Sequence, residues 1–229
     1  EFGTPEHYFS SLNIDTDRVV HIPIKNVEEL KFDLVKQLEE IGIEDKVYVM
    51  IDSIGNLASK KELDDARDEK SVADMTRAKQ LKSLFRMVTP YLAMKDVPLV
   101  AVNHTYQTQE MFSKAVVSGG TGVYYSADNI WIIGRQQEKK GTEIEGYNFI
   151  INVEKSRFVK EKSKIPISVT WEGGIKKWSG LLDVALEGEF VVKPTMGWYS
   201  KVDMETGVAE ESKVRAAATE TKEFWDGII

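Results

Sequence analysis

The stretch VYVMIDS, residues 47–53, decides the fold that we expect. Five consecutive apolar residues lead into Asp52 and Ser53, and the turn-forming pair Gly55-Asn56 follows. A short apolar run closed by turn residues is typical of a buried strand in a parallel sheet. Ligands of open α/β sheets bind just past the carboxyl ends of such strands. A carboxylate at that point can hold Mg²⁺, although a helix N-cap or a turn aspartate explains this stretch alone equally well.

The segments around this stretch predict an alternation of strands and helices. Asn26 and Glu29 resemble a capping box, and apolar residues recur behind them at helical spacing as far as about Gly42. The other elements expected in the first half are a strand at 19–24, a helix from Ser71 towards Met94 with Pro90 as a kink position, and a strand at 98–103. This β-α-β-α-β order predicts a parallel, doubly covered sheet with right-handed crossovers.

The pattern changes in the second half of the chain. Residues 105–122 form a proline-free stretch with no clear period, and loops of this length are usually functional or mobile. Residues 59–70 are charged and also without pattern. The elements expected further on are strands at 129–134, 146–154 and 165–171, a helix at 178–187, extended segments at 190–192 and 197–200, and a terminal helix at 210–224. The three strands should be antiparallel, since their connections are too short for crossover helices.

Composition excludes several classes of protein. The chain has 229 residues, is 42% hydrophobic and carries a formal net charge of −7. We therefore expect one α/β domain over residues 1–229, in which nucleic-acid binding would have to come from local basic segments. The absence of cysteine excludes disulfides and thiolate-bound metal and fits a cytoplasmic location. No apolar run approaches the roughly 18 residues of a membrane span, so we expect no membrane partner.

Three groups of side chains could carry chemistry. Asn103-His104 ends a strand expected beside that of Asp52, where it could sense a phosphate; a hydrogen-bonded strand cap is the plainer interpretation. Lys155 and Arg157 lie two apart on an expected strand, so their side chains should point together. They open the basic tract 155–164, which has a net charge of +4 and no obvious internal partners. A lysine-rich, solvated edge strand is the alternative explanation of this tract.

The third group lies within residues 105–122. It combines two glutamines, an aromatic ring, a cation and glycines, which suits binding of single-stranded nucleic acid through charge, stacking and flexible main-chain amides. The candidate residues are Gln107, Gln109, Phe112, Lys114, Gly119 and Gly120.

Several segments resemble the RecA-type recombinases, and most of all the strand-exchange recombinases of large tailed phages. They are MIDSIGNLASKKE, VNHTYQTQEMFSK followed by SGGTG, INVEKSRFVKEK and KPTMGWYS, and the resemblance covers essentially the whole chain. It implies a RecA-like ATPase core with a parallel central sheet flanked by helices and antiparallel strands added in the C-terminal half. It also implies a full protein that binds ATP and Mg²⁺, assembles into a helical filament on single-stranded DNA, and catalyses homologous pairing and strand exchange with double-stranded DNA. Single-strand-binding and recombination-mediator proteins are then candidate partners, in the cytoplasm of an infected bacterium.

The sequence departs from the family in one respect. It contains no G-x-x-x-x-G-K-[ST] phosphate-binding loop, which in the family precedes the strand that carries Asp52. We therefore expect the chain to be the C-terminal part of a recombinase core and to be inactive towards ATP alone. A non-hydrolysing DNA-binding or regulatory RecA paralogue is the alternative. An unrelated Mg²⁺-dependent hydrolase is disfavoured, because no second acidic cluster completes its site.

The resemblance also assigns roles around the nucleotide. Asp52, beside Ser53, resembles the aspartate that organises Mg²⁺, and Glu1 resembles the glutamate that activates the attacking water. His104 falls where many relatives have a glutamine that senses the γ-phosphate, so its protonation state becomes an open variable. Lys155 and Arg157 resemble a pair that reaches a neighbouring protomer's ATP phosphates, as an arginine finger does.

Two further segments resemble the DNA-binding loops of the family. Lys61–Ser71 resembles the first loop, and Arg77 follows it as a phosphate contact. Thr105–Thr121 resembles the second loop, with Met111 and Phe112 at its wedge position.

Overall fold

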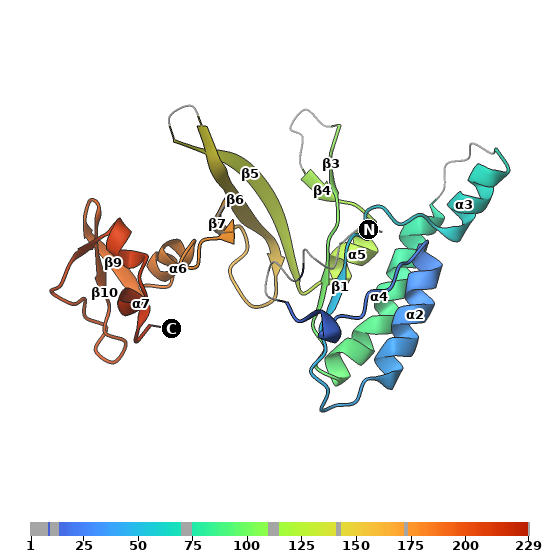
Figure 1. Ribbon diagram of the computed structural model, residues 1–229, viewed down its shortest axis with the longest axis horizontal. Coiled ribbons are helices and arrows are strands. Elements are labelled where there is room, and N and C mark those ends of the chain that lie inside the picture. The colour runs from blue at the N-terminus through green and yellow to red at the C-terminus, as the bar shows by residue number, and fades with distance from the viewer. Residues whose placement is uncertain are drawn as a thin grey trace. The chain divides into compact units, whose positions relative to one another are not determined.

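Figure 1 shows the computed structural model, which describes residue 9 and residues 14–69, 75–109, 115–140, 143–171 and 174–228. The chain divides into two compact units, of which the first ends at Ala127 and the second begins at Asp128. The architecture is mixed α/β, as predicted, whereas a single domain over 1–229 stays a prediction. The first unit contains η1 (Thr16–Arg18), α2 (Val27–Glu40), β1 (Val49–Ile51), α3 (Lys60–Arg67), α4 (Thr76–Met94), β2 (Leu99–Ala101), β3 (Thr105–Gln107), β4 (Ala115–Val117) and α5 (Thr121–Ser126). The second unit contains β5 (Asn129–Lys140), β6 (Glu143–Ser156), β7 (Lys164–Thr170), β8 (Gly174–Ile175), α6 (Leu181–Glu187), β9 (Val191–Thr195), β10 (Trp198–Lys201), β11 (Val214–Arg215), η2 (Ala216–Thr219) and α7 (Lys222–Trp225).

The core of the first unit lies between a parallel strand pair and two helices. β1 pairs with β2 in parallel, with Ile51 opposite Ala101. The residues buried with Ile51 come from α2 and α4 and include Leu30, Leu34, Leu38, Leu81, Leu84 and Val88. The other face of the pair is open in the described chain, where Met50 is 58% and Val100 46% exposed. Alternation along each strand sends these side chains away from α2 and α4, so within the first unit these helices cover one face, and a doubly covered sheet stays a prediction.

The two long helices of the first unit form where the apolar spacing of the sequence predicts them, and each buries its apolar stripe. Asn26 accepts the Glu29 N–H at 2.8 Å and so caps α2, while the Glu29 carboxylate accepts the Lys25 N–H at 2.8 Å. The helix predicted from Ser71 begins at Thr76 in the described chain, since residues 70–74 lie outside it, and it runs through Pro90 to Met94.

One prediction for the first unit is wrong, and one helix was not predicted. Residues 19–24, all of them described, form no strand, because β-branched composition does not produce a strand without a paired neighbour. The charged segment after residue 59 contains α3, which a capping box stabilises: Glu62 N–H donates to Ser59 Oγ at 3.1 Å, and Ser59 N–H donates to Glu62 Oε2 at 2.6 Å. Periodicity misses this helix, since α3 buries none of its own residues.

Residues 105–122 contain more regular structure than their sequence predicts. β3 and β4 pair in antiparallel fashion, with Thr105 opposite Val117 and Gln107 opposite Ala115. Gly119 then has φ 95°, and a Cβ there would lie 2.9 Å from Val123 Cγ2. Only glycine fits this turn into α5 without strain.

The second unit is built on antiparallel strands, as predicted. The order β5-β6-β7-β8 places Ile133 opposite Ile151, and Ile151 opposite Ile165. Ring contacts cross these strands: the Arg135 guanidinium lies 4.6 Å from the Tyr147 ring centre, and the centre of a Trp171 ring lies 5.4 Å from it.

The structure of the C-terminal part differs from the helices expected at 178–187 and 210–224. α6 begins only at Leu181, after Gly180 in a left-handed conformation. The terminal helix predicted at 210–224 is absent; β11 pairs with β10, and α7 has only four residues. Trp225 Nε1 donates to the Thr219 carbonyl at 2.6 Å and buries its ring, so strand pairing and packing override helical composition.

A tight turn follows β10. Asp203 accepts the N–H groups of Glu205 and Thr206, both at 2.9 Å, and these bonds lower the pKa of the Asp203 carboxyl. Within the described ranges, no helix has the length and hydropathy needed to cross a bilayer.

Candidate functional site

Parallel pairing of β1 and β2 brings Asp52, Ser53 and His104 to the same edge of the first unit. The strand ladder continues beyond both strands: Val102 N–H donates to the Ile51 carbonyl at 2.9 Å, and Ile54 N–H donates to the Val102 carbonyl at 3.0 Å. The expectation that these two strands are neighbours is confirmed. We call this region the Asp52–His104 edge.

Asp52 and Ser53 differ in their surroundings. Asp52 is exposed, whereas Ser53 is only 6% exposed and its hydroxyl has no hydrogen-bond partner within the described structure. The peptide bond between them is cis. A buried hydroxyl without a partner is rare in proteins and suits a site that receives a ligand oxygen or a water.

The carboxylate and the hydroxyl at this edge are oxygen ligands of the kind that Mg²⁺ accepts. Among the described residues, no group of three or more His, Cys, Asp or Glu side chains could hold a metal. Mg²⁺ commonly keeps several waters and binds one or two carboxylates together with substrate phosphates. Asp52 could supply that carboxylate, and Ser53 a hydroxyl beside it.

His104 is linked to both loops at this edge. A Cβ on Gly55 would lie 2.8 Å from His104 Cγ, so the imidazole rests against bare backbone. Asn103 Oδ1 accepts the His104 N–H at 2.8 Å, and Asn103 Nδ2 donates to the Ser118 carbonyl at 2.8 Å. Ser118 N–H donates to the His104 carbonyl at 2.9 Å. Together these bonds tie the end of β2 to the end of β4.

Arg77 has a role that the sequence did not predict. Its Nε donates to the Leu57 carbonyl at 2.7 Å, and its Nη2 donates to the Ile54 and Gly55 carbonyls, both at 2.8 Å. The guanidinium therefore holds the loop after β1, while a DNA phosphate contact stays a prediction. The spacing of residues 77, 81, 84 and 88 could have revealed this role, because it places Arg77 on the buried stripe of α4.

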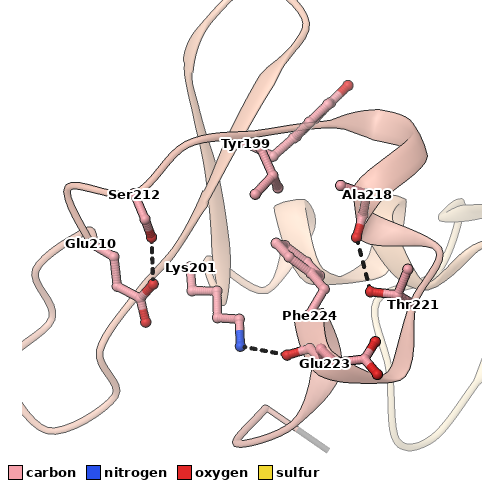
Figure 2. Close-up of a pocket in the computed structure, with 9 residues that line it drawn as sticks. Tyr199, Lys201, Glu210, Ser212, Ala218, Thr221, Glu223 and Phe224 are labelled. Atoms are coloured by element: carbon pink, nitrogen blue, oxygen red, sulfur yellow. Dashed lines mark hydrogen bonds between the residues drawn. The ribbon is translucent and has the colours of Figure 1, made fainter.

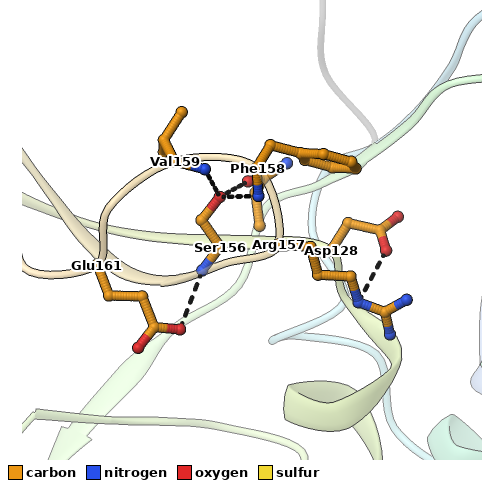
Figure 3. A network of polar contacts seen from close by, with 7 residues as sticks. Asp128, Ser156, Arg157, Phe158, Val159 and Glu161 are labelled. Atoms are coloured by element: carbon orange, nitrogen blue, oxygen red, sulfur yellow. Dashed lines mark hydrogen bonds and ion pairs between the residues drawn. The ribbon is translucent and has the colours of Figure 1, made fainter. Parts of the chain in front are cut away.

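The second part of the candidate site is the turn formed by residues 156–162, which we call the 156–162 turn (Figure 3). Ser156 ends β6, and its Oγ accepts the N–H groups of Phe158 and Val159, both at 3.1 Å. Lys155 lies within β6, but Arg157 lies one residue past its end. The expectation that both cations share a strand is therefore corrected.

The basic tract is also paired internally, contrary to expectation. Arg157 Nε lies 3.3 Å from Asp128 Oδ1, and a dashed line marks this ion pair in Figure 3. Two further ion pairs join Lys160 to Glu187 at 3.3 Å and Lys162 to Glu154 at 3.0 Å. Both members of the Arg157 pair are more than half exposed, so the pair contributes little to stability and can be exchanged at small cost.

Several predicted site residues lie outside the described residues or have no test in the structure. Those outside it are Glu1, Met111, Phe112, Lys114 and residues 70–71 of the first DNA loop. Gln109 is exposed just after β3, and Gly119 and Gly120 lead into α5, each with a positive φ. Their DNA-binding roles stay predictions.

The C-terminal part also contains a pocket of about 320 Å³ that the sequence did not indicate (Figure 2). Phe224 and Tyr199 give it apolar walls. Lys201 Nζ donates to the carbonyls of Glu223 at 3.4 Å and Asp226 at 3.0 Å, so this cation is already engaged. The lining residues are Tyr199, Lys201, Glu210, Ser212, Val214, Ala218, Thr221, Glu223 and Phe224.

Comparison with known proteins confirms the predicted resemblance. The chain is 56% identical, over 229 residues, to the recombination and repair protein of Enterobacteria phage T4, covering 98% of this chain and 59% of that protein. It is 23% identical to RecA of Mycoplasma mycoides, covering 94% of this chain and 61% of that protein, and 23% identical to RecA of Streptomyces rimosus, covering 93% and 56%. The chain thus spans about three fifths of the length of these relatives. Residues 178–229 match the family model described as Bacteriophage T4, Recombination and repair protein, C-terminal domain.

Proposed function

We propose, from this likeness to a phage recombination and repair protein along almost the whole chain, that the chain is part of an ATP-dependent DNA recombinase. The whole protein would bind single-stranded DNA, assemble into a filament, and carry out homologous pairing and strand exchange with duplex DNA. The 56% identity, in an alignment that covers 98% of the chain, carries this proposal, since the alignment includes both parts of the candidate site. The fold in this proposal is a RecA-like ATPase core.

The Asp52–His104 edge would receive the ATP phosphates. Bound Mg²⁺ would neutralise phosphate charge there, and Asp52 would hold it, with the Ser53 hydroxyl beside it. His104 would donate a hydrogen bond to the γ-phosphate, and Glu1 would orient the attacking water. The bonds from Asn103 to Ser118 and His104 support a link from this edge to residues 105–122, which would bind DNA.

Lys155 and Arg157 would act on the nucleotide of a neighbouring protomer. Arg157 is at the surface of a turn, and its exposed ion pair with Asp128 is easily replaced by a stronger phosphate contact. A cation supplied by a neighbour would make hydrolysis depend on assembly. The whole protein would then be a DNA-dependent ATPase, with single-strand-binding and mediator proteins as further partners.

ATP turnover by the full-length protein, with and without single-stranded DNA, tests the function. We expect turnover to require DNA and to be lost in Asp52→Asn, which keeps the size of the side chain and removes its charge. The chain of residues 1–229 alone should show no micromolar ATP binding by calorimetry, because it lacks the phosphate-binding loop. ATP turnover that is the same with and without DNA would contradict the proposal. Micromolar ATP binding by residues 1–229 alone would contradict it as well.

A mixing experiment tests the action across protomers. Lys155→Ala in the full-length protein should lower DNA-stimulated turnover by roughly 10³-fold, the scale on which trans-acting arginines contribute. A mixture of Asp52→Asn and Lys155→Ala proteins should regain activity at interfaces that join an intact edge to an intact cation. If the mixture stays as inactive as either variant while both assemble on DNA, the cations act within their own protomer.

A further inference from the structure

The tip of the 156–162 turn exposes two apolar side chains. Phe158 is 75% exposed and Val159 is 58% exposed. They follow Arg157 directly and precede Lys160. In Figure 3 the Phe158 ring points away from the polar network of the turn. An aromatic ring presented in this way has the shape and chemistry of an interface anchor.

The backbone beneath these side chains is held in place by many bonds. Ser156 Oγ accepts the Phe158 and Val159 N–H groups, and Ser156 N–H donates to Glu161 Oε1 at 3.3 Å. At the base of the turn, Lys162 N–H donates to the Val153 carbonyl at 2.8 Å. The turn is therefore ordered before it meets a partner, and binding through it loses less conformational entropy than binding through a flexible loop.

The charges around the tip favour a protein partner over nucleic acid. Arg157, Lys160 and Lys162 each have a carboxylate partner within the second unit. Each of these three cations therefore has a carboxylate beside it, and the rim of the tip carries charges of both signs. The tip offers an apolar pair inside a polar rim, which is the usual composition of a protein–protein contact.

We propose that Phe158 and Val159 anchor this turn in a second copy of the chain, on the surface beside that copy's Asp52–His104 edge. The proposal rests on the proposed function, in which Arg157 reaches that edge. Successive α-carbons are about 3.8 Å apart, so a protomer that receives Arg157 also meets Phe158. Affinity and chemistry then reside in adjacent residues: Phe158 provides binding, and Arg157 provides charge to the nucleotide.

Assembly of the full-length protein on long single-stranded DNA, followed by sedimentation with a non-hydrolysable ATP analogue, tests the anchor. We expect Phe158→Ala to raise the protein concentration needed for assembly about 10-fold or more, as loss of a buried aromatic contact predicts. Phe158→Leu keeps a large apolar side chain and should assemble at a concentration close to that of the wild type. The matched control is Phe32→Ala, because Phe32 is also exposed, at 65%, but lies on α2. That variant should assemble as the wild type does.

Turnover separates the anchor from the neighbouring cation. At saturating protein, Phe158→Ala should hydrolyse ATP at the wild-type rate per assembled protomer, while Arg157→Ala should assemble and not turn over. Wild-type assembly by Phe158→Ala would overturn the anchor and leave the proposed function intact. Failure of the wild-type protein to assemble on DNA would instead overturn the proposed function, and the anchor with it. A further arm uses an oligonucleotide too short for two protomers; if Phe158→Ala weakens binding there, the partner is DNA and the proposal is wrong.

Discussion

The loop after β1 and the turn after β6 both follow strand ends and both carry candidate site residues, yet they are stabilised in different ways. Residues 52–59 are fixed from outside: the Arg77 side chain, on another element, binds carbonyls of Ile54, Gly55 and Leu57. The 156–162 turn is fixed mainly from within, by the Ser156 side chain. The first arrangement holds a loop in which Ser53, Ile54 and Ser59 are buried, whereas the second leaves the Phe158 and Val159 side chains exposed for a partner.

Replacing Arg77 should give the largest effect on stability. Arg77→Met keeps most of the length of the side chain but leaves three carbonyls without their charged donor. We expect the free energy of unfolding to fall by roughly 2–4 kcal/mol. Urea unfolding followed by far-ultraviolet circular dichroism measures this, because the long helices α2 and α4 lie in the first unit.

Arg86→Met is the matched control, since Arg86 is exposed on the same helix. Its effect should stay within about 0.5 kcal/mol. Equal effects of the two substitutions would mean that Arg77 does not hold the loop.

Ser59→Ala should give the next largest effect. Ser59 is fully buried and caps α3 through the bonds it exchanges with Glu62. Loss of such a cap costs about 1–2 kcal/mol when the site is buried. The same circular dichroism experiment measures this loss in the free energy of unfolding. If Ser59→Ala lost less than Ser156→Ala, the loop after β1 would not be held more firmly than the 156–162 turn.

Ser156→Ala should have a smaller and more local effect. Ser156 Oγ accepts the amides of Phe158 and Val159, but the turn is open to water, which can replace these bonds. We expect the free energy of unfolding to fall by about 0.5–1 kcal/mol. Hydrogen exchange at the two amides should accelerate, while exchange in β7 stays unchanged. Unaltered protection of both amides would show that the hydroxyl does not organise the turn.

Phe158→Ala should give the smallest effect on stability. The ring is mostly exposed, so its removal should change unfolding by less than about 0.5 kcal/mol. Tryptophan fluorescence is the suitable probe, since all five tryptophans lie after residue 127 and therefore in the second unit. A loss above about 1 kcal/mol would show that Phe158 packs within its own chain.

Periodic parts of the sequence predicted their structure well. α2, α4 and the strands β5, β6 and β7 have apolar spacing that tertiary packing confirms. α3 was missed because its stability comes from a local cap and not from an apolar face. The C-terminal segment was assigned the wrong structure because pairing with β10 outweighs the helical preference of Ala216 and its neighbours.

The candidate site was predictable where a general rule of sheets applies. Parallel strands end at the same edge, so the order of elements along the chain was enough to place Asp52 and His104 together. The Arg157–Asp128 pair could not be predicted, because it depends on the register of β5 with β6, which sets Asn129 opposite Ser156. No spacing in the sequence encodes that register.

The hydrogen bonds of Asn103 hold the base of the β3–β4 pair in place. Each strand has three residues, and both are tied at the base, where Asn103 and His104 bind Ser118. Thr105 follows His104 directly, so the first residue of β3 is continuous with the backbone that carries the imidazole against Gly55.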